Sequence, residues 1–123
     1  IASFYPSKIA GGGSDTLNAG QVLYAGQSVA SNNGRYRLSM QTDGNLVIYN
    51  PYGPIWASNT WRSDANQLVM QTDGNLVLYG PGGPRWASNT WRSPANRVIM
   101  QDDGNLVMYG PTGAVWASGT MGR

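Results

Sequence analysis

One set of polar side chains recurs three times in the chain with the same spacing, Gln-x-Asp-x-Asn-x-Val-x-Tyr. A carboxylate accepts hydrogen bonds only, an amide both donates and accepts, and a phenol does either. Such a set suits a ligand with several neighbouring hydroxyl groups, and it contains no paired base and nucleophile. The pattern therefore favours reversible binding over catalysis. The residues are Gln41, Asp43, Asn45, Val47 and Tyr49; Gln71, Asp73, Asn75, Val77 and Tyr79; and Gln101, Asp103, Asn105, Val107 and Tyr109.

The composition disfavours most catalytic chemistries. The chain has no His and no Cys, so it lacks the commonest general base, the commonest metal ligand and any disulfide. All six carboxylates are Asp. The adjacent residues Asp102 and Asp103 would point to opposite faces of a strand, or around a turn, and so form no acid/base dyad. We expect neither an enzyme nor a cofactor.

Metal, nucleic-acid and membrane binding are also disfavoured. The Thr-Asp-Gly-Asn turns resemble fragments of calcium loops, but they lack the further oxygen ligands and the terminal Glu. The eight basic residues are scattered singly and the net charge is only +2, which is a weak case for nucleic acid. No apolar run approaches the ~20 residues of a membrane span. We expect no metal, no nucleic acid and no membrane insertion.

The polar set lies on a hairpin whose register follows from its apolar residues. If Leu38 and Met40 face inward on one strand, and Leu46 and Ile48 on the next, Met40 must lie opposite Leu46, because paired residues share a face. The connection is then the three residues 42–44, which suits a type I turn closed by a left-handed glycine and a bulge. The polar set occupies the other face. The same alternation recurs at Leu68, Met70, Leu76 and Leu78, and at Val98, Met100, Leu106 and Met108.

These hairpins predict an all-β protein built from three equivalent units. Strand-forming residues occur in short runs between Gly, Pro, Asn and Asp, and there is no Glu and only one Lys. The units repeat every 30 residues. A single unit cannot bury its apolar face alone, so we expect three sheets around a pseudo-threefold axis. We place Trp56, Trp86 and Trp116, which are equivalent positions, at its centre.

The length of 123 residues predicts one domain. The segment 1–13 has no counterpart in the repeat, and we expect it to be an N-terminal tail. The domain then covers 14–123, with repeats at about 14–60, 61–90 and 91–123.

The pattern Gln-x-Asp-x-Asn-x-Val-x-Tyr, which occurs three times, resembles that of the monocot mannose-binding, or bulb-type, lectins. The resemblance covers roughly residues 15–120. It implies the β-prism II fold, with three four-stranded antiparallel sheets. It also implies calcium-independent binding of mannose: Asp43 and Asn45 would bind the axial 2-hydroxyl, Gln41 the 3-hydroxyl and Tyr49 the 4-hydroxyl, and Val47 would pack against the ring carbons.

The resemblance further implies the partners of the chain. We expect it to be secreted and to bind mannose and mannosylated glycans or glycoproteins. Family members commonly exchange the C-terminal strand, so we expect a homodimer formed by exchange of residues 115–120.

Other interpretations of the same residues stay open. Asp-Gly is a common turn pair, and the Gln, Asn and Tyr side chains could serve only strand packing, although their retention in three copies favours sugar binding. A protein-interaction or structural module with degenerate sugar sites is the alternative function, and a β-trefoil lectin would have longer repeats.

The chain departs from the plant members of the family at two places. The disulfide usual near the first site is absent, where this chain has Gly44 and the stretch 64–67. Where plant relatives have glycines after the Ser-Asn-Thr segment, this chain has Trp61-Arg62 and Trp91-Arg92. These aromatic residues could extend a site, form an interface or pack over a turn.

Overall fold

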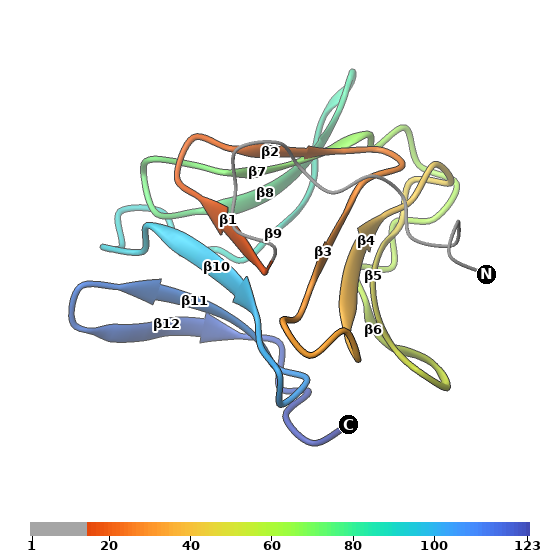
Figure 1. The fold of residues 1–123 in the computed structure, drawn as a ribbon. Helices are drawn as coiled ribbons and strands as arrows, with labels where there is room; N and C mark the ends of the chain where they lie inside the picture. The colour runs from red at the N-terminus through yellow and green to blue at the C-terminus, as the bar shows by residue number, and fades with distance from the viewer. Residues whose placement is uncertain (1–14) are drawn as a thin grey trace.

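The structure, a computed structural model, describes residues 15–123, which form β-strands and no helix (Figure 1). The strands make three four-stranded antiparallel sheets. The first sheet has the order β3 (Ser28–Ala30), β4 (Arg37–Met40), β5 (Leu46–Asn50) and β6 (Gly53–Ala57). The second has the order β2 (Val22–Tyr24), β7 (Gln67–Met70), β8 (Leu76–Gly80) and β9 (Gly83–Ala87). The third has the order β1 (Thr16–Asn18), β10 (Arg97–Met100), β11 (Leu106–Gly110) and β12 (Gly113–Ala117).

Each sheet combines a contiguous three-stranded unit with one strand from the segment 16–30. The strands β1, β2 and β3 pair with β10, β7 and β4, so this segment runs across all three sheets in turn (Figure 1). It thereby links the three sheets. The tail expected over 1–13 lies outside the described residues, and the repeat boundaries stay a prediction.

The predicted hairpin register is confirmed in every repeat. Met40 pairs with Leu46 and Leu38 pairs with Ile48, and the second and third units have the equivalent pairs. All four of these side chains are at most 1% exposed. The inward face of the hairpin is therefore core, which leaves the polar set on the outer face.

The turn has the expected three-residue form. The backbone N–H of Gln41 donates to the carbonyl of Asn45 at 2.9 Å, and that of Gly44 donates to the carbonyl of Gln41 at 3.3 Å. Gly44 has a φ of +91°, and a Cβ there would lie 2.5 Å from the backbone oxygen of Ser63. Both the left-handed backbone and the close approach of residue 63 require glycine.

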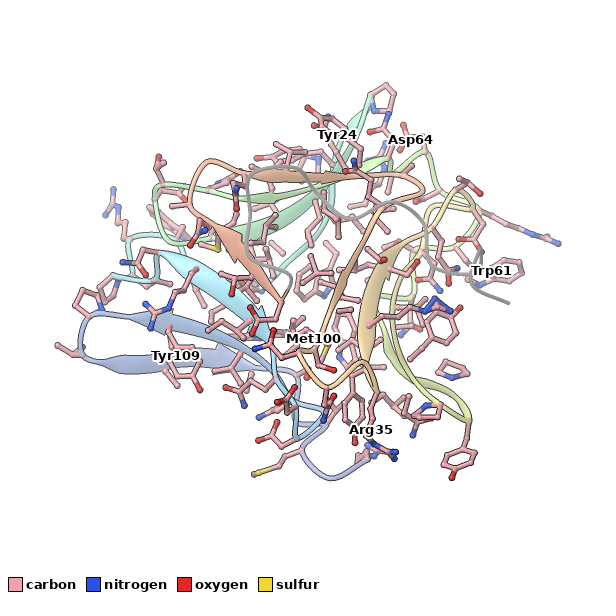
Figure 2. The ribbon with its side chains drawn as sticks, in the orientation of Figure 1. Tyr24, Arg35, Trp61, Asp64, Met100 and Tyr109 are labelled. Atoms are coloured by element: carbon pink, nitrogen blue, oxygen red, sulfur yellow. The ribbon has the colours of Figure 1, made fainter. Side chains whose placement is uncertain are left out.

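The three tryptophans meet at the centre, as expected. The indole centroids lie 5.5 Å apart for Trp56 and Trp86, 5.7 Å for Trp86 and Trp116, and 6.3 Å for Trp56 and Trp116, all edge-to-face. Such edge-to-face pairs are a favoured aromatic geometry. The rings are partly buried and pack against the core, in which Met100 lies between the sheets (Figure 2).

The tryptophans face inward because of a bulge in each outer hairpin. In the first sheet Ile48 pairs with Trp56 but Tyr49 pairs with Pro54, so Ile55 is the extra residue. Trp56 shares the inward face of Ile48, and the same register shift recurs in the other two sheets.

The C-terminal strand β12 completes the sheet of its own chain in this structure. It pairs with β11, with Met108 opposite Trp116. The third sheet is thus closed within one chain. No helix long and apolar enough to cross a membrane occurs among residues 15–123.

Candidate functional site

The polar side chains of the first repeat form a chain of hydrogen bonds on the outer face of the sheet β3–β6. The hydroxyl of Tyr49 donates to Oε1 of Gln41. Nε2 of Gln41 donates to both carboxylate oxygens of Asp43, at 3.1 and 3.0 Å. Oδ1 of Asp43 also accepts from the backbone N–H of Asn45 at 3.0 Å. The Gln41 amide is therefore held at both ends before any ligand arrives.

The second and third repeats reproduce this chain closely. Nε2 of Gln71 lies 3.1 Å from both carboxylate oxygens of Asp73, and that of Gln101 lies 3.1 and 3.2 Å from those of Asp103. The tyrosine of each repeat donates to its glutamine in the same way. The sequence-predicted Gln, Asp, Asn and Tyr are thus brought together three times.

The orientation of Asn45 is set by residues that the sequence analysis did not assign to the site. Its Oδ1 accepts from Oγ of Ser58 at 3.2 Å and from the backbone N–H of Thr60 at 3.1 Å. Oγ1 of Thr60 in turn donates to the carbonyl of Gly44 at 2.6 Å. Because the oxygen of Asn45 is engaged, its two N–H donors are left for a ligand.

In the sequence, these anchoring residues belong to a Ser-Asn-Thr element that follows each hairpin. The repetition of this element could have drawn attention to it, but the sequence does not show that it holds the asparagine. The same bonds form in the other repeats, where Ser88 and Thr90 donate to Asn75 and where Ser118 and Thr120 donate to Asn105. The third copy has glycine in place of the middle Asn and keeps both bonds.

The valines of the pattern form the floor of the outer face. Val47 and Val77 are 3% exposed and Val107 is 4% exposed. A ligand can therefore reach only a small part of each valine. The tyrosine and the glutamine are more accessible, and they provide the sides of the site.

Open clefts adjoin the first and second sites. The cleft at the first site has a volume of about 290 Å³ and is lined by Gly26, Ser39, Met40, Gln41, Thr42 and Asp43. The cleft at the second has about 330 Å³ and is lined by Gly20, Val69, Met70, Gln71, Thr72 and Asp73. A larger cleft of about 490 Å³ extends from Tyr49 over the loop before β4 and the β5–β6 turn. Both of the smaller clefts are lined by the glutamine and the aspartate of the polar set, but not by its asparagine, valine or tyrosine.

No protein-family model matches the chain. The B-type lectin plumieribetin of Scorpaena plumieri is 44% identical over 52 residues, which are 42% of this chain and 45% of that protein. A mannose-specific lectin of Narcissus pseudonarcissus is 49% identical over 43 residues, or 32% of this chain and 39% of that protein. The chain spans less than half the length of either of these curated relatives.

Solved structures match over much more of the chain. A monomeric monocot mannose-binding lectin of Gastrodia elata is 47% identical, with a TM-score of 0.79 over 87% of this chain and 98% of that one. The snowdrop (Galanthus nivalis) agglutinin, complexed with methyl-α-D-mannoside, is 44% identical, with a TM-score of 0.71 over 86% and 96%. The chain belongs to the bulb-type mannose-binding lectin family. The expected β-prism II fold is confirmed, because the three four-stranded antiparallel sheets match those of these lectins.

The adjacent carboxylates of Asp102 and Asp103 make different hydrogen bonds. Asp103 accepts from Gln101 and Asn105, whereas Oδ1 of the adjacent Asp102 accepts from the backbone N–H of Asn33 at 2.9 Å. The two adjacent carboxylates therefore accept hydrogen bonds from different partners. Within residues 15–123 no group of three His, Cys, Asp or Glu side chains could hold a metal ion.

Proposed function

We propose that this bulb-type lectin binds α-D-mannose and mannose-containing glycans at three sites, one on the outer face of each sheet. The observation that carries this proposal is the preassembled hydrogen-bond chain Tyr49–Gln41–Asp43, with Asn45 fixed beside it, in all three repeats. Groups that are already oriented lose little conformational freedom when a ligand binds.

The remaining donors and acceptors match the hydroxyl groups of mannose. The carboxylate of Asp43 can accept from the axial 2-hydroxyl while Nδ2 of Asn45 donates to it. Gln41 serves the 3-hydroxyl, and the Tyr49 oxygen, whose own proton points to Gln41, accepts from the 4-hydroxyl. Glucose carries its 2-hydroxyl equatorially and would leave Asp43 and Asn45 without this partner, at a cost of about 1–3 kcal/mol.

We propose that the binding needs no calcium. Each site contains a single carboxylate, and that carboxylate already accepts hydrogen bonds from the glutamine and from the backbone of its own turn. A calcium ion takes six to eight oxygen ligands, commonly from several carboxylates. Protein groups alone would hold the sugar.

Calorimetric titration with methyl α-mannoside tests the function. We expect a dissociation constant on the order of 1 mM per site, because a shallow site offers a monosaccharide few contacts. The constant should not change in EDTA, and methyl α-glucoside should bind more weakly. Absence of mannoside binding at high millimolar concentration contradicts the proposal, and loss in EDTA contradicts calcium independence.

We propose that the lectin acts outside the cell and as a homodimer that exchanges β12. The strand carries Trp116 to the central cluster, so the same contacts can form within one chain or between two. A Mycobacterium smegmatis lectin with 42% identity and a TM-score of 0.54 is a domain-swapped dimer, whereas the Gastrodia elata lectin is monomeric. A dimer would present six sites and gain about 10²–10⁴ in avidity for clustered glycans.

A further inference from the structure

Two tryptophans beside the first and second sites are exposed to solvent. The side chains of Trp61 and Trp91 are 56% and 57% exposed. Each is followed by an arginine whose guanidinium carbon lies over the indole, at 4.4 Å from the ring centroid for Arg62 and 4.3 Å for Arg92. Figure 2 shows Trp61 at the edge of the molecule, pointing away from the sheets. The arginine packs over each indole, and more than half of each tryptophan remains exposed to solvent.

The backbone of each Trp-Arg pair is hydrogen-bonded to the aspartate of the neighbouring site. The backbone N–H of Arg62 donates to the carbonyl of Asp43 at 2.5 Å. Thr60, on the other side of Trp61, holds the side chain of Asn45. Trp61 thus lies between Arg62, which binds the backbone carbonyl of Asp43, and Thr60, which holds the side-chain amide of Asn45. Arg92 makes the equivalent bond to Asp73 at 2.6 Å.

The third repeat has the same backbone without the aromatic pair. Gly122 donates its N–H to the carbonyl of Asp103 at 2.6 Å, and Met121 replaces the tryptophan. Gly122 has a φ of +78°, while Arg62 and Arg92 have values of 65° and 67°. This left-handed conformation is unfavourable for a non-glycine residue. Anchoring the turn therefore requires neither the tryptophan nor the arginine.

We infer that Trp61 and Trp91 are platforms for a second sugar residue of a glycan whose terminal mannose occupies the first or second site. The inference rests on the proposed function. The apolar C–H face of a pyranose can pack on the exposed part of the indole, and the arginine offers donors to the hydroxyl groups of the sugar. The third site has no such platform, so the three sites differ for oligosaccharides although they are alike for a monosaccharide.

The test uses chains with one working site. The parent chain carries Asp73→Asn and Asp103→Asn, so that only the first site can bind. The variant adds Trp61→Met and Arg62→Gly, which are the residues that the third repeat has at these positions. Calorimetry with methyl α-mannoside and with α-linked mannobioses compares the two forms. We expect the monosaccharide affinity to stay the same, and the affinity for at least one mannobiose to fall about 3- to 10-fold.

A matched gain-of-function variant provides the control. In a chain with Asp43→Asn and Asp73→Asn, only the third site remains, and Met121→Trp with Gly122→Arg gives it the aromatic pair. This change should raise the mannobiose affinity without raising that for methyl α-mannoside. Circular dichroism and melting curves establish that each variant is folded.

The outcomes separate this inference from the function on which it rests. If the parent first-site chain binds no methyl α-mannoside, the proposed function fails and the platform fails with it. If the parent binds and the Trp61→Met, Arg62→Gly form has unchanged affinity for every mannobiose, only the platform is overturned. An equal fall for both ligands also overturns it, because Trp61 would then support the mannose site itself. A change in oligomeric state with unchanged sugar affinities would assign the tryptophans to a protein interface.

Discussion

The backbone N–H of Thr60 donates a hydrogen bond of 3.1 Å to the side-chain oxygen of Asn45, which lies 15 residues earlier in the chain. This bond decides which end of the Asn45 amide faces a ligand. The equivalent bonds to Asn75 and Asn105 are 3.1 and 3.2 Å long. The segment after the third strand of each unit is therefore part of the proposed site, because it orients the asparagine.

Two substitutions at residue 45 separate the binding role of the amide from its structural role. Asn45→Asp keeps an oxygen that accepts from Thr60 but replaces the free donor with an acceptor beside Asp43. We expect the first site to be lost with little change in stability. Asn45→Ala also leaves the Thr60 N–H without its partner, which should cost about 1–3 kcal/mol of unfolding free energy.

Titration with methyl α-mannoside and urea denaturation measure these two effects in a chain with only the first site active. Undiminished mannoside binding by Asn45→Asp would mean that the amide donates nothing to the sugar.

The three aspartates of the polar set should each control one site. Asp43→Asn, Asp73→Asn and Asp103→Asn should each lower the number of bound methyl α-mannosides by one, because each removes the charged acceptor. The melting temperature should hardly move, since these side chains are exposed and an asparagine oxygen still accepts from the turn backbone.

Asp102→Asn is the matched control for the third site, because its carboxylate accepts from Asn33 and not from the polar set. It should bind as many sugars as the parent. If the three substitutions in the polar set instead unfold the protein, those aspartates are structural turn residues and the site assignment is wrong.

The ion pair between Asp64 and Arg85 should make a small part of the stability depend on pH. Nε of Arg85 lies 2.7 Å from Oδ1 of Asp64, and this hydrogen bond lowers the pKa of Asp64 below its usual 3.8. A carboxyl whose pKa is lowered on folding stabilises the protein above its unfolded pKa, and the effect disappears as the pH falls through the folded pKa.

Arg85→Gln should therefore reduce the unfolding free energy slightly at neutral pH and have no effect at the acidic end of the curve. Urea denaturation at several pH values, at low and high salt, measures the difference, which salt should reduce because the pair is exposed. Mannoside binding should not change. A difference that grows on acidification would contradict this assignment.

Strand exchange predicts a mass that depends on concentration. Light scattering should give a mass near twice 13.2 kDa at high concentration, with dissociation on dilution. Deletion of the residues after Gly113 removes β12 and Trp116, so it should abolish the dimer and expose Trp56 and Trp86. A 13.2 kDa monomer at every concentration would instead leave β12 paired within its own chain, as in the structure described.

The sequence by itself determined the hairpins and the composition of the sites. The alternation of Leu38 and Met40 with Leu46 and Ile48 is a local pattern of period two, and only one register puts all four side chains in the core. That register brings Gln, Asp, Asn and Tyr to the outer face of one turn. Because the unit occurs three times at a spacing of 30 residues, the sequence also predicted three such faces.

Only the tertiary structure decided how β1, β2 and β3 are divided among the sheets and how Asn45 is oriented. The strands of the segment 16–30 are short and alike, and their partners lie at different distances along the chain, so no local pattern assigns them. The bond from Thr60 to Asn45 depends on the bulge beside Tyr49 and on the closure of β6 onto β5. Such contacts depend on packing between distant segments, which neither residue spacing nor composition specifies.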